Sequence, residues 1–247
     1  MNAKMFLAVS IACAILAACG QRPAQNSEKQ DNSESKTAVA EPKAELEIIS
    51  FAGRELPSGM KHEGNVLNVI HYSDAMGDNY VFTAGRDFTS KDETLSDYDL
   101  YNSELYVYHY VTGEDGSTKQ IWRIFDNSYE CMDNTSVEIP DNSFNVTDLD
   151  KDGMAETWVL YKKTGCATDC CFPQEMKVIM YEGEQKYAMR GTDKVEQITE
   201  YEGGRKVTTS EGGDYKFDAA FHNANAEFQD YAKKMWNDNI IGITMQF

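Results

Sequence analysis

Alternating hydrophobic segments recur along most of the chain and constrain its fold class more than any other feature. Each segment is rich in Val, Ile, Tyr, Phe or Trp, and Gly, Asp and Asn lie between successive segments, as expected for strands joined by turns. The segments cover residues 66–72, 79–85, 104–111, 119–126, 157–162, 176–183 and 185–191. Three strand–turn–strand units resemble one another weakly. They are either internal repeats or the ordinary hairpins of an antiparallel protein. We therefore predict an antiparallel meander, either propeller-like or sandwich-like.

The pattern changes once, over residues 223–237, where apolar side chains recur at helical spacing and charged side chains occupy the other side. The apolar residues are Phe228, Tyr231, Ala232, Met235 and Trp236. Asn223 or Asn225 is a candidate N-cap for this segment. The prediction is a mainly β fold with one C-terminal amphipathic helix that packs on the sheet.

The N-terminal residues carry the features of an export signal. Lys4 precedes an apolar run from Met5 to Leu16, which is shorter than the about 20 residues needed to cross a membrane. The following LAAC, residues 16–19, resembles the bacterial lipoprotein signal, in which the cysteine is acylated and becomes the new first residue. That resemblance implies a signal peptide over 1–18 and a lipid anchor at Cys19. Gly20 in place of Asp favours the outer membrane, and the sequence does not distinguish its periplasmic face from its outer face.

A polar segment follows, and residues 19–45 are expected to form a lipidated, disordered tether. Residues 21–45 contain no aromatic residue and are rich in Ser, Glu, Gln, Lys, Asn and Ala, so they cannot bury enough apolar surface to offset the entropy of ordering. Residues 46–247 remain, about 200 in all, which suits a single β-rich domain.

The charge balance excludes several classes of partner. The chain has 23 basic and 41 acidic residues and a formal net charge of −18. Such a surface repels phosphate backbones and anionic lipid headgroups, so nucleic acid is a poor candidate partner. Divalent cations, basic peptides and neutral glycans fit better, and the membrane is approached through the N-terminal lipid.

Four carboxylates gather in DLDKDGMAE, residues 148–156. Asp148, Asp150 and Asp152 occupy positions 1, 3 and 5 of this stretch, the carbonyl of Met154 falls at position 7, and Glu156 stands at position 9. Oxygen ligands in this order suit a hard cation such as Ca²⁺, which takes six to eight of them. The alternative is a turn fixed by side-chain to backbone hydrogen bonds, with its charges in solvent.

Position 12 and the segments on either side of the acidic stretch indicate which kind of calcium loop it resembles. An EF-hand needs a Glu at position 12, but Val159 stands there, and the flanking segments are strand-like. The stretch resembles instead the strand–loop–strand calcium loops of FG-GAP and integrin-type propeller repeats, in which the ninth position closes the site. That position is usually Asp, and the longer Glu156 is a departure. We expect a structural calcium ion here.

Cysteines that survive maturation suggest disulfides, because the expected compartment is oxidising. They are Cys131, Cys166, Cys170 and Cys171. A bond between the adjacent Cys170 and Cys171 would be strained, which leaves 131–170 with 166–171, or 131–171 with 166–170. A soft-metal or redox site in 166–171 is the alternative, although the segment has no CxxC and no adjacent His.

No catalytic motif accompanies these features. The histidines are scattered, and neither a Ser-His-Asp order, a phosphate-binding Gly loop nor HExxH is present. The absence of such motifs from the sequence favours a non-catalytic role. Enzymatic activity stays open, because an acidic pair for glycoside hydrolysis is defined by its separation in space and not by a sequence motif.

From about Glu104 to Trp236 the chain is similar to a family of exported bacterial proteins described as surface polysaccharide biosynthesis proteins. The similarity is carried by residues 146–162, 176–195 and 228–236. It implies a link to capsule or lipopolysaccharide, brings no catalytic residues, and implies pairing of Cys131 with Cys166. The expectation is a lipid-anchored, calcium-stabilised, non-catalytic protein of the outer envelope that binds a glycan or a protein partner. The alternative is a periplasmic glycan-modifying enzyme.

Overall fold

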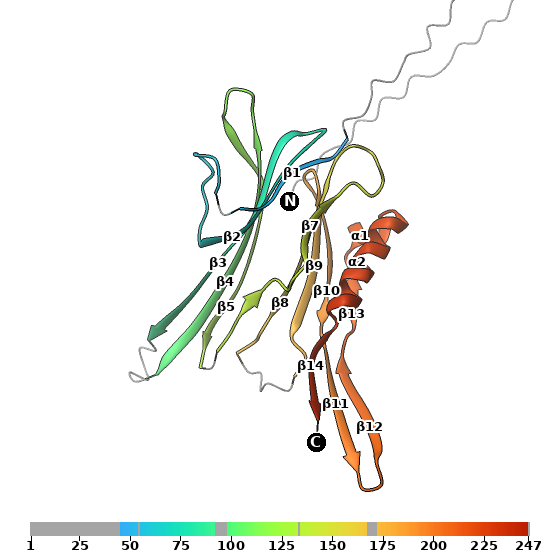
Figure 1. Ribbon diagram of the computed structural model, residues 1–247. Helices are drawn as coiled ribbons and strands as arrows, with labels where there is room; N and C mark the ends of the chain where they lie inside the picture. Colours follow the sequence, from blue (N-terminus) through green and yellow to red (C-terminus); the bar gives the residue numbers. More distant parts are fainter. Residues whose placement is uncertain (1–44, 54, 92–97, 133, 167–171, 247) are drawn as a thin grey trace, which may run out of the picture. The chain divides into compact units, whose positions relative to one another are not determined.

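The computed structural model describes residues 45–246, apart from 54, 92–97, 133 and 167–171 (Figure 1). The expected signal peptide over 1–18, the lipid anchor at Cys19 and the tether lie outside the described residues, apart from residue 45, and stay predictions. Within the part that is described, no helix has the length and hydrophobicity needed to cross a membrane.

The first sheet is a five-stranded antiparallel meander in which the strands follow one another in chain order. Its strands are β1 (Glu47–Gly53), β2 (Asn65–Asp74), β3 (Gly77–Lys91), β4 (Asp99–Thr112) and β5 (Thr118–Cys131). Alternation along these strands follows the pleat, so successive side chains point to opposite faces. The predicted meander is confirmed here, and β1 is a strand that the hydrophobic pattern did not reveal.

A second, six-stranded antiparallel sheet has the order β13-β10-β9-β8-β6, with β7 also pairing with β8. Its strands are β6 (Val137–Glu138), β7 (Phe144–Thr147), β8 (Glu156–Lys163), β9 (Glu175–Glu182), β10 (Gln185–Thr192) and β13 (Tyr215–Phe217). A third sheet contains β11 (Lys194–Tyr201), β12 (Arg205–Gly212) and β14 (Ile241–Gln246), and its β11–β14 pair is parallel.

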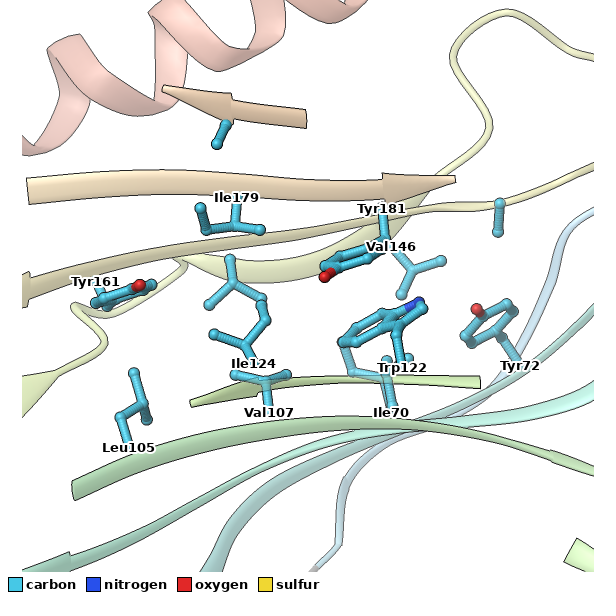
Figure 2. Close-up of a cluster of buried hydrophobic side chains, with 14 of the residues drawn as sticks. Ile70, Tyr72, Leu105, Val107, Trp122, Ile124, Val146, Tyr161, Ile179 and Tyr181 are labelled. Carbon is cyan, nitrogen blue, oxygen red and sulfur yellow. The ribbon is translucent and has the colours of Figure 1, made fainter. Parts of the chain in front are cut away.

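The first two sheets pack face to face around one hydrophobic core (Figure 2). Val107 and Ile124 of the first sheet lie opposite Ile179 of the second. At one end of the core the ring of Trp122 stacks on Tyr181, with ring centroids 4.2 Å apart. Of the two expected architectures, this arrangement is the sandwich-like one. In each alternating segment, the residues on one face of the strand point inward, into the core between the two sheets.

Two helices cover the other face of the second sheet, α1 (Ala219–Asn223) and α2 (Ala226–Asn239) (Figure 1). Trp158 and Met180 from the sheet pack there with Phe228 and Trp236 from α2. Because β8 and β9 are buried on both faces, their sequences are nearly continuous hydrophobic runs. The C-terminal amphipathic helix is therefore confirmed, and the short α1 is an addition to it.

The helix begins three residues later than the sequence pattern indicated, because α1 occupies residues 219–223. Asn225, not Asn223, is the N-cap of α2, and its side-chain oxygen accepts a hydrogen bond from the amide of Phe228 at 2.9 Å. Asn223 instead ends α1.

A disulfide joins Cys131, at the end of β5, to Cys166, just after β8. This corrects both pairings deduced from the strain between adjacent cysteines, and it confirms the pairing implied by the family resemblance. Both pairings were wrong because they gave Cys131 and Cys166 other partners in order to avoid a bond between Cys170 and Cys171. The α-carbons of Cys131 and Cys166 lie 4.5 Å apart, so the bond ties the end of the first sheet to the second. Cys170 and Cys171 lie outside the described residues.

Candidate metal site

The acidic stretch 148–156 forms the turn between β7 and β8, and its carboxylates converge. Oxygen atoms of Asp148, Asp150 and Glu156 all lie within 4.8 Å of one another, as do those of Asp150, Asp152 and Glu182. Asp150 belongs to both groups. A cluster of this kind could hold a metal ion, because oxygen ligands at this separation can share one cation.

Side-chain to backbone hydrogen bonds shape the turn. Asp150 Oδ1 accepts from the amide of Asp152 at 3.2 Å, and Asp152 Oδ1 accepts from the amide of Met154 at 2.7 Å. Asp148 Oδ2 accepts from the amide of Gly153 at 3.3 Å, and Gly153 has a left-handed φ of 84° that suits glycine. The bonds expected of a simple turn are thus present, and each aspartate keeps a second oxygen that the turn does not use. The proposed role of the Met154 carbonyl stays a prediction.

Glu156 is the most deeply placed of these carboxylates and is fully buried. Its Oε2 accepts from the hydroxyl of Thr147 at 2.6 Å, and the amide of Leu149 reaches both oxygens at 3.0 and 3.1 Å. The pKa of Glu156 is raised to about 7, mainly by burial and further by the charges of Asp150 and Asp148. The hydrogen bonds from Thr147 and Leu149 act in the opposite direction and lower the pKa. A nearby cation would instead favour the ionised carboxylate.

Glu182 is the member of the cluster that the sequence pattern missed. It ends β9 and stands directly opposite Glu156 in the antiparallel β8–β9 ladder. Burial raises the pKa of Glu182, and the charges of Asp150 and Asp152 raise it further, while a hydrogen bond from Tyr187 opposes this. Like charges directly opposite one another destabilise a sheet. No local motif marks Glu182, since only the strand register brings it to the loop.

One oxygen of Asp148 lacks a partner that a cation could provide. Among the described residues, Asp148 Oδ1 is buried and has no hydrogen-bond partner. Leaving such a group unpaired costs about 1–3 kcal/mol, and more when it is charged. A cation held by the cluster would supply the partner that this oxygen lacks.

Contacts with two other parts of the fold hold the loop in place. Asp74, at the end of β2, accepts a hydrogen bond from the amide of Ala155 at 2.9 Å, and the amide of Ala75 donates to the carbonyl of Gly153 at 2.8 Å. On the helical side, Asn225 Nδ2 donates to Asp150 Oδ2 at 3.4 Å. The cluster therefore lies where the β2–β3 turn, the second sheet and the start of α2 meet.

Three other candidate residues, Cys166, His109 and His71, make structural contacts. Cys166 is in a disulfide, so it is not a thiolate available for the soft-metal or redox site considered for 166–171. His109 is buried, with Nε2 2.8 Å from Asn79 Oδ1, and burial lowers its pKa to about 4. His71 lies 2.6 Å from Asp78 and stacks on Tyr80.

Comparison of the chain with models of known protein families, with curated proteins and with solved structures found no match. The functional argument therefore depends on the geometry of the acidic cluster and on the sequence features.

Proposed function

We propose that this chain is a calcium-stabilised, non-catalytic protein of the bacterial outer envelope, lipid-anchored at Cys19, that binds a glycan or a protein partner. The observation that carries the calcium part is the convergence of Asp148, Asp150 and Glu156, with the fully buried Glu156 opposite Glu182. A cation there would offset the repulsion among these carboxylates and would tie the β7–β8 turn to β9.

Calcium is favoured over other metals by the chemistry of the ligands. The two groups of converging side chains offer carboxylate oxygens rather than thiolate or imidazole groups, and hard oxygen ligands suit Mg²⁺, Ca²⁺ and Mn²⁺. Ca²⁺ tolerates irregular coordination by six to eight oxygens, whereas Mg²⁺ demands near-ideal octahedral geometry. A cluster spread over a turn and a neighbouring strand suits the more tolerant ion.

The location and the partner are supported by the sequence. The LAAC stretch ending at Cys19 supports export and acylation, and Gly20 supports the outer membrane. No family model matches the chain, so the link to surface glycan is proposed from the sequence resemblance to surface polysaccharide biosynthesis proteins alone. The net charge of −18 disfavours nucleic acid and anionic lipid.

A glycan-modifying enzyme is the alternative, and three carboxylates, Asp87, Glu104 and Glu138, line a cavity of about 360 Å³ in the described part of the chain. Glu104 is the buried one of the three, and it accepts hydrogen bonds from Arg86 Nη2 at 2.6 Å and from the hydroxyl of Tyr106 at 2.9 Å. A carboxylate engaged in this way is a poor proton donor. The binding role is therefore the better supported of the two.

Thermal unfolding of the mature chain with a chelator, with CaCl₂ and with MgCl₂ tests the calcium proposal. At a calcium concentration 100 times the Kd, binding stabilises the folded state by about 2.7 kcal/mol, which raises Tm by roughly 5–10 °C for a domain of this size. Asp150→Ala should abolish the calcium response, because Asp150 is shared by both groups of carboxylates.

Asp115→Ala is the matched control. Asp115 lies in the β4–β5 turn, where its Oδ1 accepts from the amide of Ser117 at 2.9 Å, much as Asp150 accepts from Asp152. The Asp115 variant should keep the full calcium response. A wild-type Tm that is the same in chelator and in calcium would refute the calcium proposal.

A further inference from the structure

A groove opens between the two packed sheets, and its lining residues are not those of the acidic cluster. A cavity of about 360 Å³ lies between β2–β4 and residues 136–139, and a neighbouring hollow of about 150 Å³ lies between β2 and residues 139–144. Both are lined by Asn68 and Ile139, so they are adjacent. We call the two together the inter-sheet groove. Its size falls in the range of small-ligand sites.

Strand register shows which side chains face this groove. Thr83 on β3 pairs with Val107 on β4, and Gly85 pairs with Leu105. Val107 and Leu105 belong to the core between the sheets, so Thr83 and Gly85 face the same space. Gly85 leaves room here, because a Cβ at this position would meet Leu67 at 3.3 Å.

Beside its charged residues, the lining contains neutral polar groups and aliphatic groups. Its amides and hydroxyls come from Asn65, Asn68, Thr83, Ser103 and Ser136. The aliphatic side chains include Leu67, which is 43% exposed beside the two asparagines. Amide and hydroxyl groups that converge beside apolar carbon match a ligand with many hydroxyls and exposed C–H faces. A saccharide has this chemistry.

Thr83 provides an independent indication of a ligand. It is fully buried, it lines the cavity, and among the described residues its hydroxyl has no hydrogen-bond partner. The neighbouring hydroxyls differ from it in this respect. Ser103 Oγ accepts from the amide of Val137 at 2.9 Å, and Ser136 Oγ lies 3.2 Å from Thr164 Oγ1. Thr83 is thus the buried group of the lining that a ligand hydroxyl could satisfy.

Charge narrows the class of ligand. The cation at the groove, Arg86, is neutralised by Glu104, with Arg86 Nε 2.8 Å and Nη2 2.6 Å from Glu104 Oε2. The other charged lining residues, Asp87 and Glu138, are carboxylates. An anionic ligand would be repelled by these groups and by the net charge of the chain.

We propose that the inter-sheet groove is the ligand site of this protein and that it binds a short stretch of a neutral oligosaccharide. The proposal rests on the glycan-binding part of the proposed function and not on its calcium part. Amides at the mouth contact sugar hydroxyls, Leu67 packs against the C–H face of a sugar ring, and Thr83 hydrogen-bonds the most deeply inserted hydroxyl.

The test is a binding measurement on the mature chain in calcium. The probes are maltotetraose, cellotetraose and chitotetraose as neutral saccharides, with tetragalacturonate and tetralysine as charged ones. NMR titration follows the side-chain amide signals of Asn65 and Asn68 and the methyl signals of Leu67. At least one neutral saccharide should shift these signals, and tetragalacturonate should not.

Two matched variants separate the groove from general effects on the fold. Thr83→Val removes the unpartnered hydroxyl with little change of shape, and should weaken saccharide binding roughly fivefold to tenfold, the equivalent of one hydrogen bond. It should not lower Tm, because the hydroxyl has no described partner to lose. Thr112→Val removes another buried hydroxyl without a described partner, away from the groove lining, and should leave affinity unchanged.

Each other outcome counts against the groove. Failure of every neutral saccharide to bind, or tighter binding of tetralysine, would overturn the saccharide proposal and leave the calcium-dependent melt unaffected. Saccharide binding that shifts signals elsewhere, or that Thr83→Val and Thr112→Val weaken equally, would overturn the groove while the glycan-binding function stands.

Discussion

Replacing Glu156 by Gln should stabilise the metal-free protein and abolish most of the gain from calcium. Burial raises the pKa of Glu156 from 4.5 to about 7. A carboxyl group whose pKa is raised by folding destabilises the folded state when it is ionised. The penalty is absent below pH 4.5, grows between pH 4.5 and 7, and is complete above pH 7. At 1.36 kcal/mol per pKa unit it reaches about 3 kcal/mol.

The glutamine side chain of the Glu156→Gln variant carries no charge, so the penalty disappears, while weaker hydrogen bonds from Leu149 and Thr147 return about 1 kcal/mol of it. The net expectation at pH 8 without metal is a gain of about 2 kcal/mol, or roughly 4–8 °C in Tm. In calcium the order reverses, because the wild type is stabilised by the ion and Glu156→Gln lacks a ligand.

Urea unfolding of both proteins at pH 8 and at pH 4.5, metal-free and in calcium, measures this. The difference between variant and wild type is compared at each pH, so that other titrating groups cancel. Glu104→Gln is the matched control. Burial opposes ionisation of Glu104, but hydrogen bonds from Tyr129, Tyr106 and Arg86 outweigh it and lower the pKa. Glu104→Gln should therefore destabilise the protein at pH 8 by about 1–3 kcal/mol. A metal-free Glu156→Gln protein less stable than wild type at pH 8 would refute the argument.

Three further predictions follow from contacts elsewhere in the fold. Burial lowers the pKa of His109 from 6.5 to about 4, so the contribution of His109 to stability is complete above pH 6.5 and falls by up to about 3 kcal/mol as the pH drops to 4. In urea unfolding across that pH range, His109→Gln should flatten this decline. An unchanged dependence of stability on pH would contradict the prediction. Replacing Cys131 and Cys166 together by Ser opens a loop of 35 residues and should cost about 4 kcal/mol in urea unfolding, and a loss below about 1 kcal/mol would show that the loop is ordered without the bond. Asn225→Ala removes the helix cap and should cost about 1 kcal/mol with or without calcium. Asn225→Asp keeps the cap and adds a charge beside Asp150, so it should enlarge the calcium-dependent rise in Tm. Equal calcium responses in the two variants would contradict this.

Local pattern was sufficient for the features that depend on neighbours in sequence. Alternation with period two predicted strands, because the pleat sends successive side chains to opposite faces. The spacing of Phe228, Ala232 and Met235 predicted a helix for the equivalent reason, and its buried face is the predicted one. The aspartates of 148–152 could be recognised as one cluster, since a tight turn brings alternate residues together whatever surrounds it.

Tertiary structure decided the features that depend on register and on packing between distant segments. Glu182 joins the cluster only because β8 and β9 pair so that it faces Glu156, and a register shifted by one residue would place it on the opposite face of the sheet. The inter-sheet groove forms between β2–β4 and residues 136–144, which no periodicity relates. A sequence pattern records which face of its own strand or helix a residue occupies, but what that face meets depends on long-range packing, which the free energy of the whole fold selects.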